Sequence, residues 1–244
     1  MRAANGFIRA LSEMGKDKEV ESLRVDCYGS LAATGKGHGT DRAIILGLMG
    51  DAPETVDVDM VENRLEVVNA TKKLLLPWGK PIDFDPGTDL DMSHSIPLPL
   101  HPNGMHFVAL NRTGEVLWEQ IYYSTGGGFV STDEELRNPL PNGEDVEVPY
   151  IYQTASDLVD LCVKEEMSVS QIAFKNELAF RSSEEVRLRL HAIWQAMQEC
   201  VTRGLSRKGI LPGGMNIRRR VKDMHDTLLR RGEAVLCDPL TILD

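Results

Sequence analysis

A glycine-rich segment, Thr34–Asp41, combines residue types that could carry out acid–base chemistry. Its sequence, Thr-Gly-Lys-Gly-His-Gly-Thr-Asp, alternates glycines with polar side chains. His38 can exchange a proton near neutral pH, and Asp41, three residues later, could fix the tautomer of its imidazole. Glycines also let a ligand approach the backbone closely. The segment is therefore a candidate catalytic loop; in the alternative interpretation, Asp41 caps a helix that begins near Ala43 and His38 is an exposed loop residue.

The same segment does not have the pattern of a nucleotide-binding P-loop. That motif needs a second glycine five positions after the first, and Ser or Thr directly after the lysine. Here Thr34 stands five positions after Gly29, and Gly37 follows Lys36. We therefore exclude nucleotide binding through a P-loop.

A second candidate site lies where a predicted strand runs into three glycines, in the sequence Tyr-Tyr-Ser-Thr-Gly-Gly-Gly-Phe of Tyr122–Phe129. The hydroxyls of Ser124 and Thr125, next to backbone N–H groups, would suit a small carboxylate or phosphate. The segment is not a nucleophile elbow, because tyrosines precede the serine. A flexible turn is the alternative interpretation.

Other polar residues give weaker signals. His94, His101 and His106 lie in or near a proline-rich stretch without metal-ligand spacing, and we interpret them as loop or surface histidines. Asn176 lies in the middle of a predicted helix, where an exposed polar face is the simpler explanation.

Alternating and helical patterns place these motifs on predicted elements. In the first part of the chain, the predicted helices cover 1–15 and 59–70, a further helix could begin at 43–49, and the predicted strands are 22–28, 105–110 and 115–123. Prolines and glycines between residues 76 and 102 predict loops around short extended pieces.

After residue 150 the pattern is helical. The predicted helices are 156–165, 168–180, 184–203 and a basic helix around 217–231. Thr154 or Ser156, Ser168, and Ser183 are the expected helix caps. We therefore predict an α+β fold, with a mixed α/β domain over residues 1–150 and an all-helical segment over 151–244.

Composition limits the class of protein. The chain has 244 residues, is 42% hydrophobic and 26% charged, and carries a formal net charge of -10. These values exclude intrinsic disorder and disfavour a nucleic-acid binder, which is usually basic. No run approaches the roughly 18 apolar residues of a membrane helix. The four cysteines show no C-x-x-C or zinc-finger spacing, so we expect reduced thiols in a cytoplasmic protein.

Four motifs in order resemble the bacterial iron–sulfur L-serine dehydratases, a resemblance that covers essentially the whole chain. The signature loop of that family resembles residues 25–41, and the glycine cluster at 122–129 resembles a second family segment. Residues 175–179 (Lys-Asn-Glu-Leu-Ala) and 209–214 (Gly-Ile-Leu-Pro-Gly-Gly) are similar to a third and a fourth. The implied fold is the β domain of the family followed by the start of its helical α domain.

The resemblance implies conversion of L-serine to pyruvate and ammonia, in amino-acid catabolism and gluconeogenesis, at a 4Fe-4S cluster that polarises the substrate hydroxyl. By resemblance, His38 and Asp41 are the expected acid/base pair. The residues expected to bind substrate are Thr34, Lys36, Thr40, Ser124, Thr125, Gly126, Gly127 and Asn176.

Two departures from the family pattern limit what we expect of this chain alone. A Ser-Ser-Ser-His-Thr segment usual in the family is absent, and Cys27, Cys162, Cys200 and Cys237 do not match its cluster cysteines in position. We expect the cluster ligands beyond residue 244, no metal ligands in this chain, and no activity of this chain alone.

The expected partners are L-serine and either a second copy in a homodimer or a completing C-terminal chain, with neither nucleic acid nor membrane. Two alternatives stay open: a non-catalytic serine-binding regulatory module, and one chain of a split two-subunit dehydratase.

Overall fold

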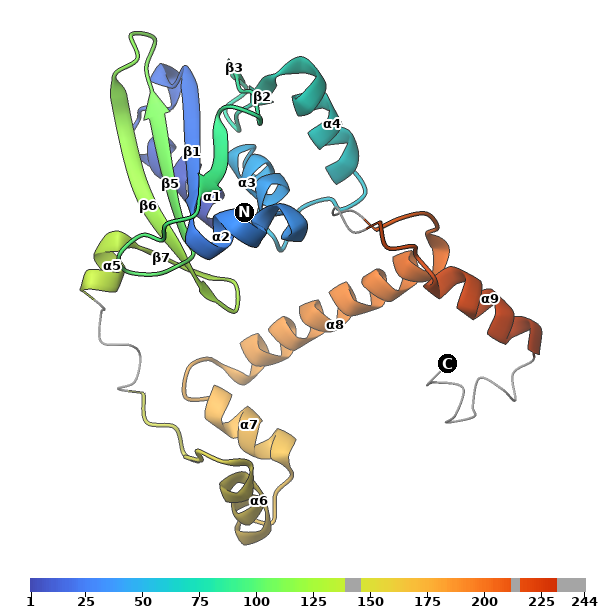
Figure 1. The fold of residues 1–244 in the computed structure, drawn as a ribbon. Coiled ribbons are helices and arrows are strands. Elements are labelled where there is room, and N and C mark those ends of the chain that lie inside the picture. Colours follow the sequence, from blue (N-terminus) through green and yellow to red (C-terminus); the bar gives the residue numbers. More distant parts are fainter. Residues whose placement is uncertain (139–145, 212–215, 232–244) are drawn as a thin grey trace. The chain divides into compact units, whose positions relative to one another are not determined.

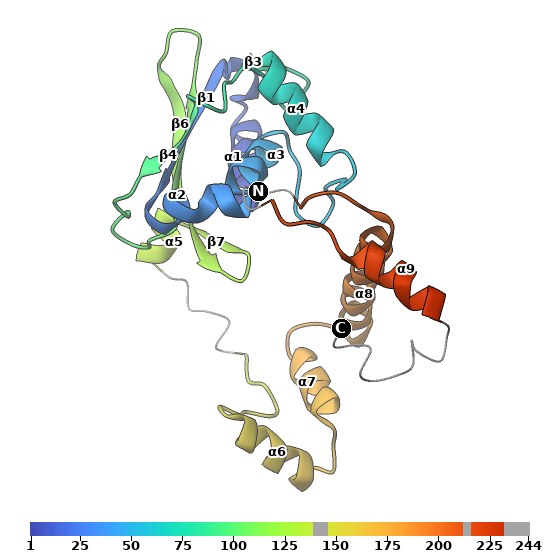
Figure 2. The same ribbon diagram turned by 45° about the vertical axis from the view of Figure 1, so that its right-hand side comes forward.

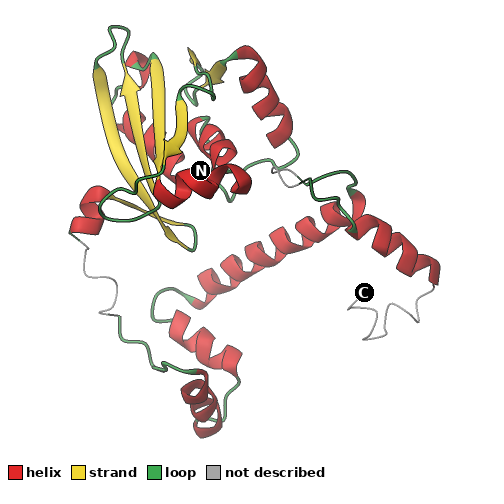
Figure 3. Ribbon diagram, in the orientation of Figure 1, coloured by secondary structure: helices red, strands yellow, loops and turns green. Residues whose placement is uncertain are grey.

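The computed structural model describes residues 1–138, 146–211 and 216–231 (Figure 1). The chain divides into two compact units, one of Met1–Leu140 and Pro212–Asn216, the other of Pro141–Leu211 and Ile217–Asp244. The predicted α+β fold class is confirmed, because the strands of the sheets belong to the first unit and the described elements that follow are helices (Figure 3). The assignment of domains over 1–150 and 151–244 stays a prediction.

The first unit alternates helices with short strands. In chain order its elements are α1 (Arg2–Glu13), the 3-10 helix η1 (Asp17–Glu19), β1 (Ser22–Tyr28), α2 (Gly29–Gly35), the 3-10 helix η2 (Lys36–His38), α3 (Thr40–Leu48), α4 (Val61–Thr71), β2 (Lys73–Leu75), β3 (Pro81–Asp83), β4 (Leu90–His94), β5 (Gly104–Leu110), β6 (Val116–Gly126), β7 (Phe129–Thr132) and α5 (Asp133–Arg137).

Five of the strands form one mixed sheet in the order β4-β1-β5-β6-β7, and β2 pairs with β3 separately. The β1–β4 pair is parallel, and the other pairs of the sheet are antiparallel. Strand β1 has the predicted bounds. Its side chains alternate, so Leu23, Val25 and Cys27 are buried in the core while Arg24 and Asp26 lie on the opposite face.

The helices α1 and α3 cover one face of this sheet (Figure 2). Phe7 of α1 stacks on Trp118 of β6 with ring centroids 4.7 Å apart and lies 5.4 Å from the ring of Phe107 on β5. Phe7 and Phe107 are fully buried, and burial of such a side chain contributes about 1.5–3 kcal/mol. The core therefore fixes the helix layer on the sheet, and with it the polar segment between α2 and α3.

The glycine-rich segment is helical, contrary to the predicted loop. Helix α2 continues to Gly35, η2 follows, and α3 begins at Thr40 after a single left-handed residue, Gly39, with φ of 72°. The Leu-Ala-Ala run of residues 31–33 favours a helix. Gly35 packs closely against Met92, since a Cβ atom there would lie 2.6 Å from Cε of Met92 and the end of that flexible side chain would have to move.

The elements β7 and α5 were not predicted. Strand β7 has four residues, too few for a clear alternation. Helix α5 begins with a capping box, in which the Thr132 side chain accepts from the backbone N–H of Glu135 and the Glu135 carboxylate accepts from that of Thr132. The Thr-x-x-Glu spacing of a capping box is a sequence signal that could have identified this helix.

The second unit is described by four helices, α6 (Ala155–Lys164), α7 (Val169–Glu177), α8 (Ser183–Ser206) and α9 (Val221–Arg231). Thr154 and Ser168 cap α6 and α7 as predicted, each through a capping box. The cap of α8 is Ser182 and not the expected Ser183. Within the described ranges, no helix combines the length and the apolarity that crossing a bilayer requires.

Candidate functional site

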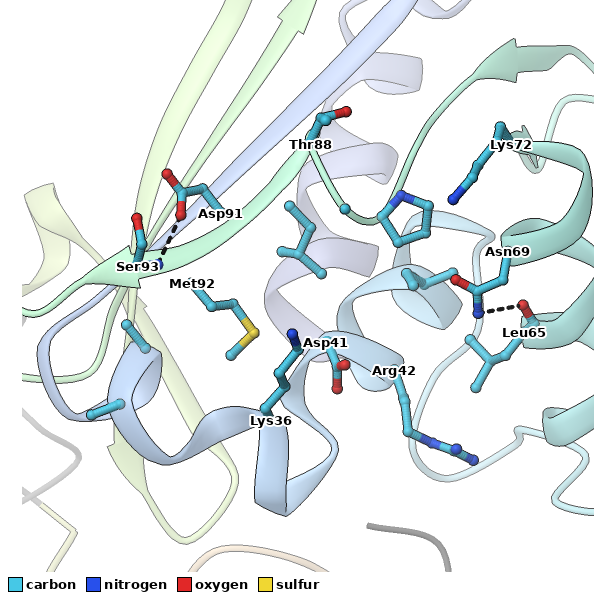
Figure 4. A pocket seen from close by; sticks show the side chains of 16 residues that line it. Lys36, Asp41, Arg42, Leu65, Asn69, Lys72, Thr88, Asp91, Met92 and Ser93 are labelled. Carbon is cyan, nitrogen blue, oxygen red and sulfur yellow. Dashed lines mark hydrogen bonds between the residues drawn. The ribbon is translucent and has the colours of Figure 1, made fainter. Parts of the chain in front are cut away.

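A cavity of about 900 Å³ opens in the first unit beside the predicted site segment (Figure 4). Its walls come from the α2–α3 region, from α4 and from the segment that ends in β4. The lining residues are Ala32, Ala33, Lys36, Asp41, Arg42, Ile45, Leu65, Asn69, Lys72, Pro86, Gly87, Thr88, Leu90, Asp91, Met92 and Ser93. Of the residues predicted for the site, Lys36 and Asp41 line it.

Asp41 lines this cavity and has one buried, unsatisfied oxygen. It lies in the first turn of α3, which begins at Thr40, so it does not cap a helix beginning near Ala43. Its Oδ1 atom is buried and has no hydrogen-bond partner among the described residues. A buried acceptor without a donor costs about 1–3 kcal/mol, so the carboxylate of Asp41 carries an uncompensated acceptor beside the cavity that its residue lines.

The cationic side chains of the cavity differ in their partners. Lys72 is paired with Asp85 at 2.8 Å, and Arg42 is paired with Glu62. Lys36 has no ion pair or side-chain hydrogen bond within the part of the chain that the structure describes. Lys36 is therefore the cation of this lining that is available to an anionic group of a ligand.

His38 lies on the 3-10 helix between Lys36 and Asp41 and is exposed. Its Nδ1 atom is 2.8 Å from the carbonyl oxygen of Thr34. A carbonyl oxygen can only accept, so Nδ1 carries the proton, and in the neutral ring Nε2 has the free lone pair. The predicted contact between His38 and Asp41 is not formed in the described structure, and the orienting group is the Thr34 carbonyl.

The second predicted segment lies at the end of β6. Ser124 is half-buried, and its backbone N–H donates to the carbonyl of Asn103 at 2.9 Å, while Thr125, Gly126 and Gly127 are exposed. A bulge between Ser124 and Gly126 leads into the turn to β7. Gly126 and Gly127 have φ of 103° and 59°, a backbone region that favours glycine.

Strand directions bring this turn to the same end of the sheet as α2. Both β1 and β6 run antiparallel to β5, so the carboxyl ends of β1 and β6 lie at one end. Figure 1 shows α2 and the β6–β7 turn at that end. Backbone hydrogen bonds from Ser30 to Pro102, and from Ser124 to Asn103, join both segments to the loop before β5. The turn does not line the cavity.

Asn176 lies in the second unit, where its side chain forms hydrogen bonds with the backbone of Tyr150. Its Oδ1 accepts from the backbone N–H of Tyr150 at 3.0 Å, and its Nδ2 donates to the carbonyl of Tyr150 at 2.7 Å. Lys175 also lies over the Tyr150 ring, 5.7 Å from its centroid. Asn176 therefore anchors the segment that enters α6; its role toward a substrate stays a prediction, as do the roles of the other site residues.

The described cysteines do not form a set of cluster ligands. Cys27 is buried in the core, where loss of solvation raises the pKa of its thiol to about 12, so it stays protonated. Cys162 and Cys200 are free thiols on α6 and α8. Cys237, and the last three residues of the motif at 209–214, lie outside the described residues. Among the described residues, the group whose geometry could hold a metal ion consists of Asp26, Asp91 and His94, and it contains no cysteine.

Sequence reasoning missed one wall of the cavity. Asn69 and Lys72 come from the end of α4, and Thr88 from the turn before β4, so they are separated from Asp41 by up to 47 positions. In Figure 4, Lys36 and Asp41 project between Met92 of β4 on one side and Asn69 of α4 on the other. Only the packing of α4 and β4 around α3 brings these residues together, and no local pattern signals it.

Comparisons with known proteins agree with the motif order. The family described as Serine dehydratase beta chain matches residues 1–135. An L-serine dehydratase of Mycobacterium bovis is 41% identical over 228 residues, which are 93% of this chain and 49% of that protein. The Streptomyces coelicolor L-serine dehydratase is 38% identical over 96% of this chain and 51% of its own length. L-serine dehydratase 1 of Escherichia coli is 38% identical over 100% of this chain and 53% of its own length. The chain spans about half the length of these curated relatives.

Proposed function

Because this chain belongs to the Serine dehydratase beta chain family, we propose that it forms the substrate-binding part of an iron–sulfur L-serine ammonia-lyase. The reaction removes the α proton and the hydroxyl of L-serine, which gives aminoacrylate and water. Aminoacrylate tautomerises to the imine, and water hydrolyses it to pyruvate and ammonia.

His38 is the proposed acid/base group, and its hydrogen bond to the Thr34 carbonyl is the observation that carries the proposal. With Nδ1 bonded at 2.8 Å, the neutral imidazole exposes the lone pair of Nε2. The ring is therefore held in the tautomer that accepts a proton, without help from Asp41.

The cavity supplies groups that match the two charges of an amino acid. The ammonium group of serine can pair with the carboxylate of Asp41, and Lys36 can pair with the carboxylate of serine. Thr34 and Thr40 flank these residues at the ends of α2 and α3. The hydroxyl and backbone groups of 124–127 are proposed as a further binding element for the substrate carboxylate at the same end of the sheet, and a role of Asn176 toward the substrate stays a prediction.

The cluster ligands are proposed to come from the part of the relatives that this chain does not span, since the described residues offer no thiolate set. We place the protein in the cytoplasm, in amino-acid catabolism, as a homodimer or together with a completing chain. No step of the reaction above is assigned to Cys27, Cys162 or Cys200.

A chimaeric enzyme tests the proposal. This chain would replace the corresponding half of the Mycobacterium bovis relative, and pyruvate formation from L-serine would be measured after reconstitution with iron and sulfide. We expect activity from the chimaera, and at least a hundredfold lower kcat after His38→Ala. His106→Gln, on β5, is the control and should retain activity.

A measurement of L-serine binding distinguishes the proposed enzyme from the alternative of a non-catalytic regulatory module. By calorimetry, the 244-residue chain should bind L-serine, and Asp41→Asn should weaken that binding at least tenfold. Serine binding by the chain together with an inactive but folded chimaera would favour the regulatory module. An unchanged kcat in His38→Ala would remove His38 from the reaction.

A further inference from the structure

Three side chains that the proposed function does not use converge on the other face of the sheet. Asp26 of β1 and Asp91 and His94 of β4 each offer one ligand atom, and the three atoms lie within 4.8 Å of one another. Asp26 is the buried charged residue of this sheet, with 6% of its surface exposed. Two carboxylates and an imidazole at this spacing form a donor set for a metal ion.

The parallel pairing of β1 with β4 creates the cluster. Asp26 stands opposite Asp91 in the register, and a bulge after Asp26 brings Tyr28 opposite His94. Asp91 is also one of the residues that line the cavity, and in Figure 4 its carboxylate points away from Lys36 and Asp41. The cluster therefore borders the proposed serine site, but it does not include Lys36 or Asp41.

The interatomic distances suit a small cation. His94 Nε2 lies 3.2 Å from Asp91 Oδ2 and 3.7 Å from Asp26 Oδ1. Metal–ligand bonds of 2.0–2.2 Å in a tetrahedral site place ligand atoms about 3.3–3.6 Å apart. His94 Nε2 is also shielded from solvent and makes no hydrogen bond to any described group.

Neighbouring groups hold each donor in place. The ring of His94 stacks on Tyr28 with centroids 4.7 Å apart. The backbone N–H of Ser93 donates to Asp91 Oδ1 at 2.8 Å, which leaves Oδ2 toward the cluster. Such supporting contacts orient metal ligands in known sites.

Charge also favours a cation. Arg24 Nε donates to Asp26 Oδ1 at 3.1 Å and compensates one of the two carboxylates. With a neutral imidazole, one negative charge stays uncompensated. Imidazole as a ligand favours Zn²⁺ and related transition metals over Mg²⁺ or Ca²⁺.

We propose that Asp26, Asp91 and His94 bind one divalent transition-metal ion, such as Zn²⁺, which fastens β4 to β1. A separate opening of about 450 Å³, lined in part by Tyr28 and His94, provides an entry path and room for a water as fourth ligand.

Zinc titration of the chelator-treated 244-residue chain tests this site. Calorimetry should give one ion bound per chain, and excess Zn²⁺ should raise the thermal midpoint, because the ion binds only the folded state. Asp91→Asn should weaken binding at least tenfold and abolish the shift in the midpoint, since it removes one of three ligands.

The matched control lies on the same sheet. His106 and Glu119 form a two-member pair with Nε2 and Oε2 3.0 Å apart, so Glu119→Gln should leave zinc binding unchanged. Circular dichroism checks that Asp91→Asn folds, and His94→Gln is the second variant if it does not. Equal zinc affinity of the wild type and a folded variant, absence of binding at millimolar Zn²⁺, or a cobalt(II) spectrum with thiolate bands would overturn the site.

Discussion

The two units of the chain differ in the interactions that stabilise their helices. All but two of the buried hydrophobic side chains in the described residues belong to the first unit; the two in the second unit are Ile172 and Val186. Helix α8 carries a stripe of apolar residues that are each more than half exposed: Leu190, Ile193, Trp194, Met197 and Val201. Their i, i+3, i+4 spacing is that of a helix face which normally faces a core.

The difference shows that local interactions can specify a helix that buries few of its side chains in a core. In the second unit, capping boxes and ion pairs four residues apart, such as Arg189 with Glu185 at 2.7 Å, specify helices locally. Those interactions contribute tenths of a kcal/mol to about 1 kcal/mol each, whereas the buried rings of the first unit contribute several. Side chains of α8 should therefore matter little to the stability of the described structure.

A pair of aromatic substitutions gives the largest expected contrast. Phe107→Ala removes a fully buried ring that contacts Phe7 and Tyr122, and should destabilise the first unit by about 3–5 kcal/mol. Trp194→Ala removes a ring that is 55% exposed and should change stability by less than about 0.5 kcal/mol. Hydrogen exchange of the β5 and α8 amides measures both effects, and similar costs for the two would mean that α8 is packed as tightly as the sheet.

The second-largest expected effect is a loss of stability of the first unit at alkaline pH. Loss of solvation raises the pKa of the Cys27 thiol and of the Tyr122 and Tyr123 hydroxyls to about 12, from 9.0 and 10.0. Between about pH 9 and 12 the unfolded chain releases these protons while the native unit retains them, so stability should fall with rising pH in that window.

Urea unfolding at a series of pH values measures this slope. Tyr123→Phe removes one of the three groups and should make the slope shallower, at a cost of about 1 kcal/mol at pH 8 from its lost hydrogen bond to Asp133. A slope as steep as that of the wild type would show that Tyr123 is not titrating in this range.

The smallest expected effect is at a helix cap of the second unit. Thr154→Ala removes the acceptor for the backbone N–H of Asp157 and should destabilise α6 by about 1 kcal/mol. Faster exchange should be confined to the first turn of α6. Ser156→Ala, at an exposed position of the same helix, is the control; an effect of Thr154→Ala on the β1 amides would contradict the local origin of helix stability.

Elements with local signals were predictable from the sequence. Strand β1 has the predicted bounds because its apolar residues alternate, and α6 and α7 begin at expected caps. The glycines of Thr34–Asp41 predict a loop, since glycine is a poor helix former. The structure instead continues the helix of residues 29–35 into a 3-10 turn, and the Leu-Ala-Ala run at 31–33 is a local signal that could have identified it.

The candidate site was predictable in its residue types and only partly in its geometry. Lys36 and Asp41 line the cavity, but the orienting partner of His38 is the Thr34 carbonyl, four residues earlier. That contact exists because residues 34–38 turn helically, so the loop interpretation concealed it. The Asp26, Asp91 and His94 cluster needs strand pairing across 65 positions, and no spacing rule identifies such a pair.

The parallel pairing of β1 with β4 also has a consequence for the order of folding. A five-residue turn joins β5 to β6, whereas 61 residues separate the end of β1 from the start of β4. Closing the longer loop costs more chain entropy and delays the contact. Since 75 residues separate β1 from β5, its antiparallel partner, we expect β1 to pair with β5 and β4 only after the β5–β6 hairpin has formed, so the cavity wall at Met92 and the cluster at His94 would report on completion of the fold.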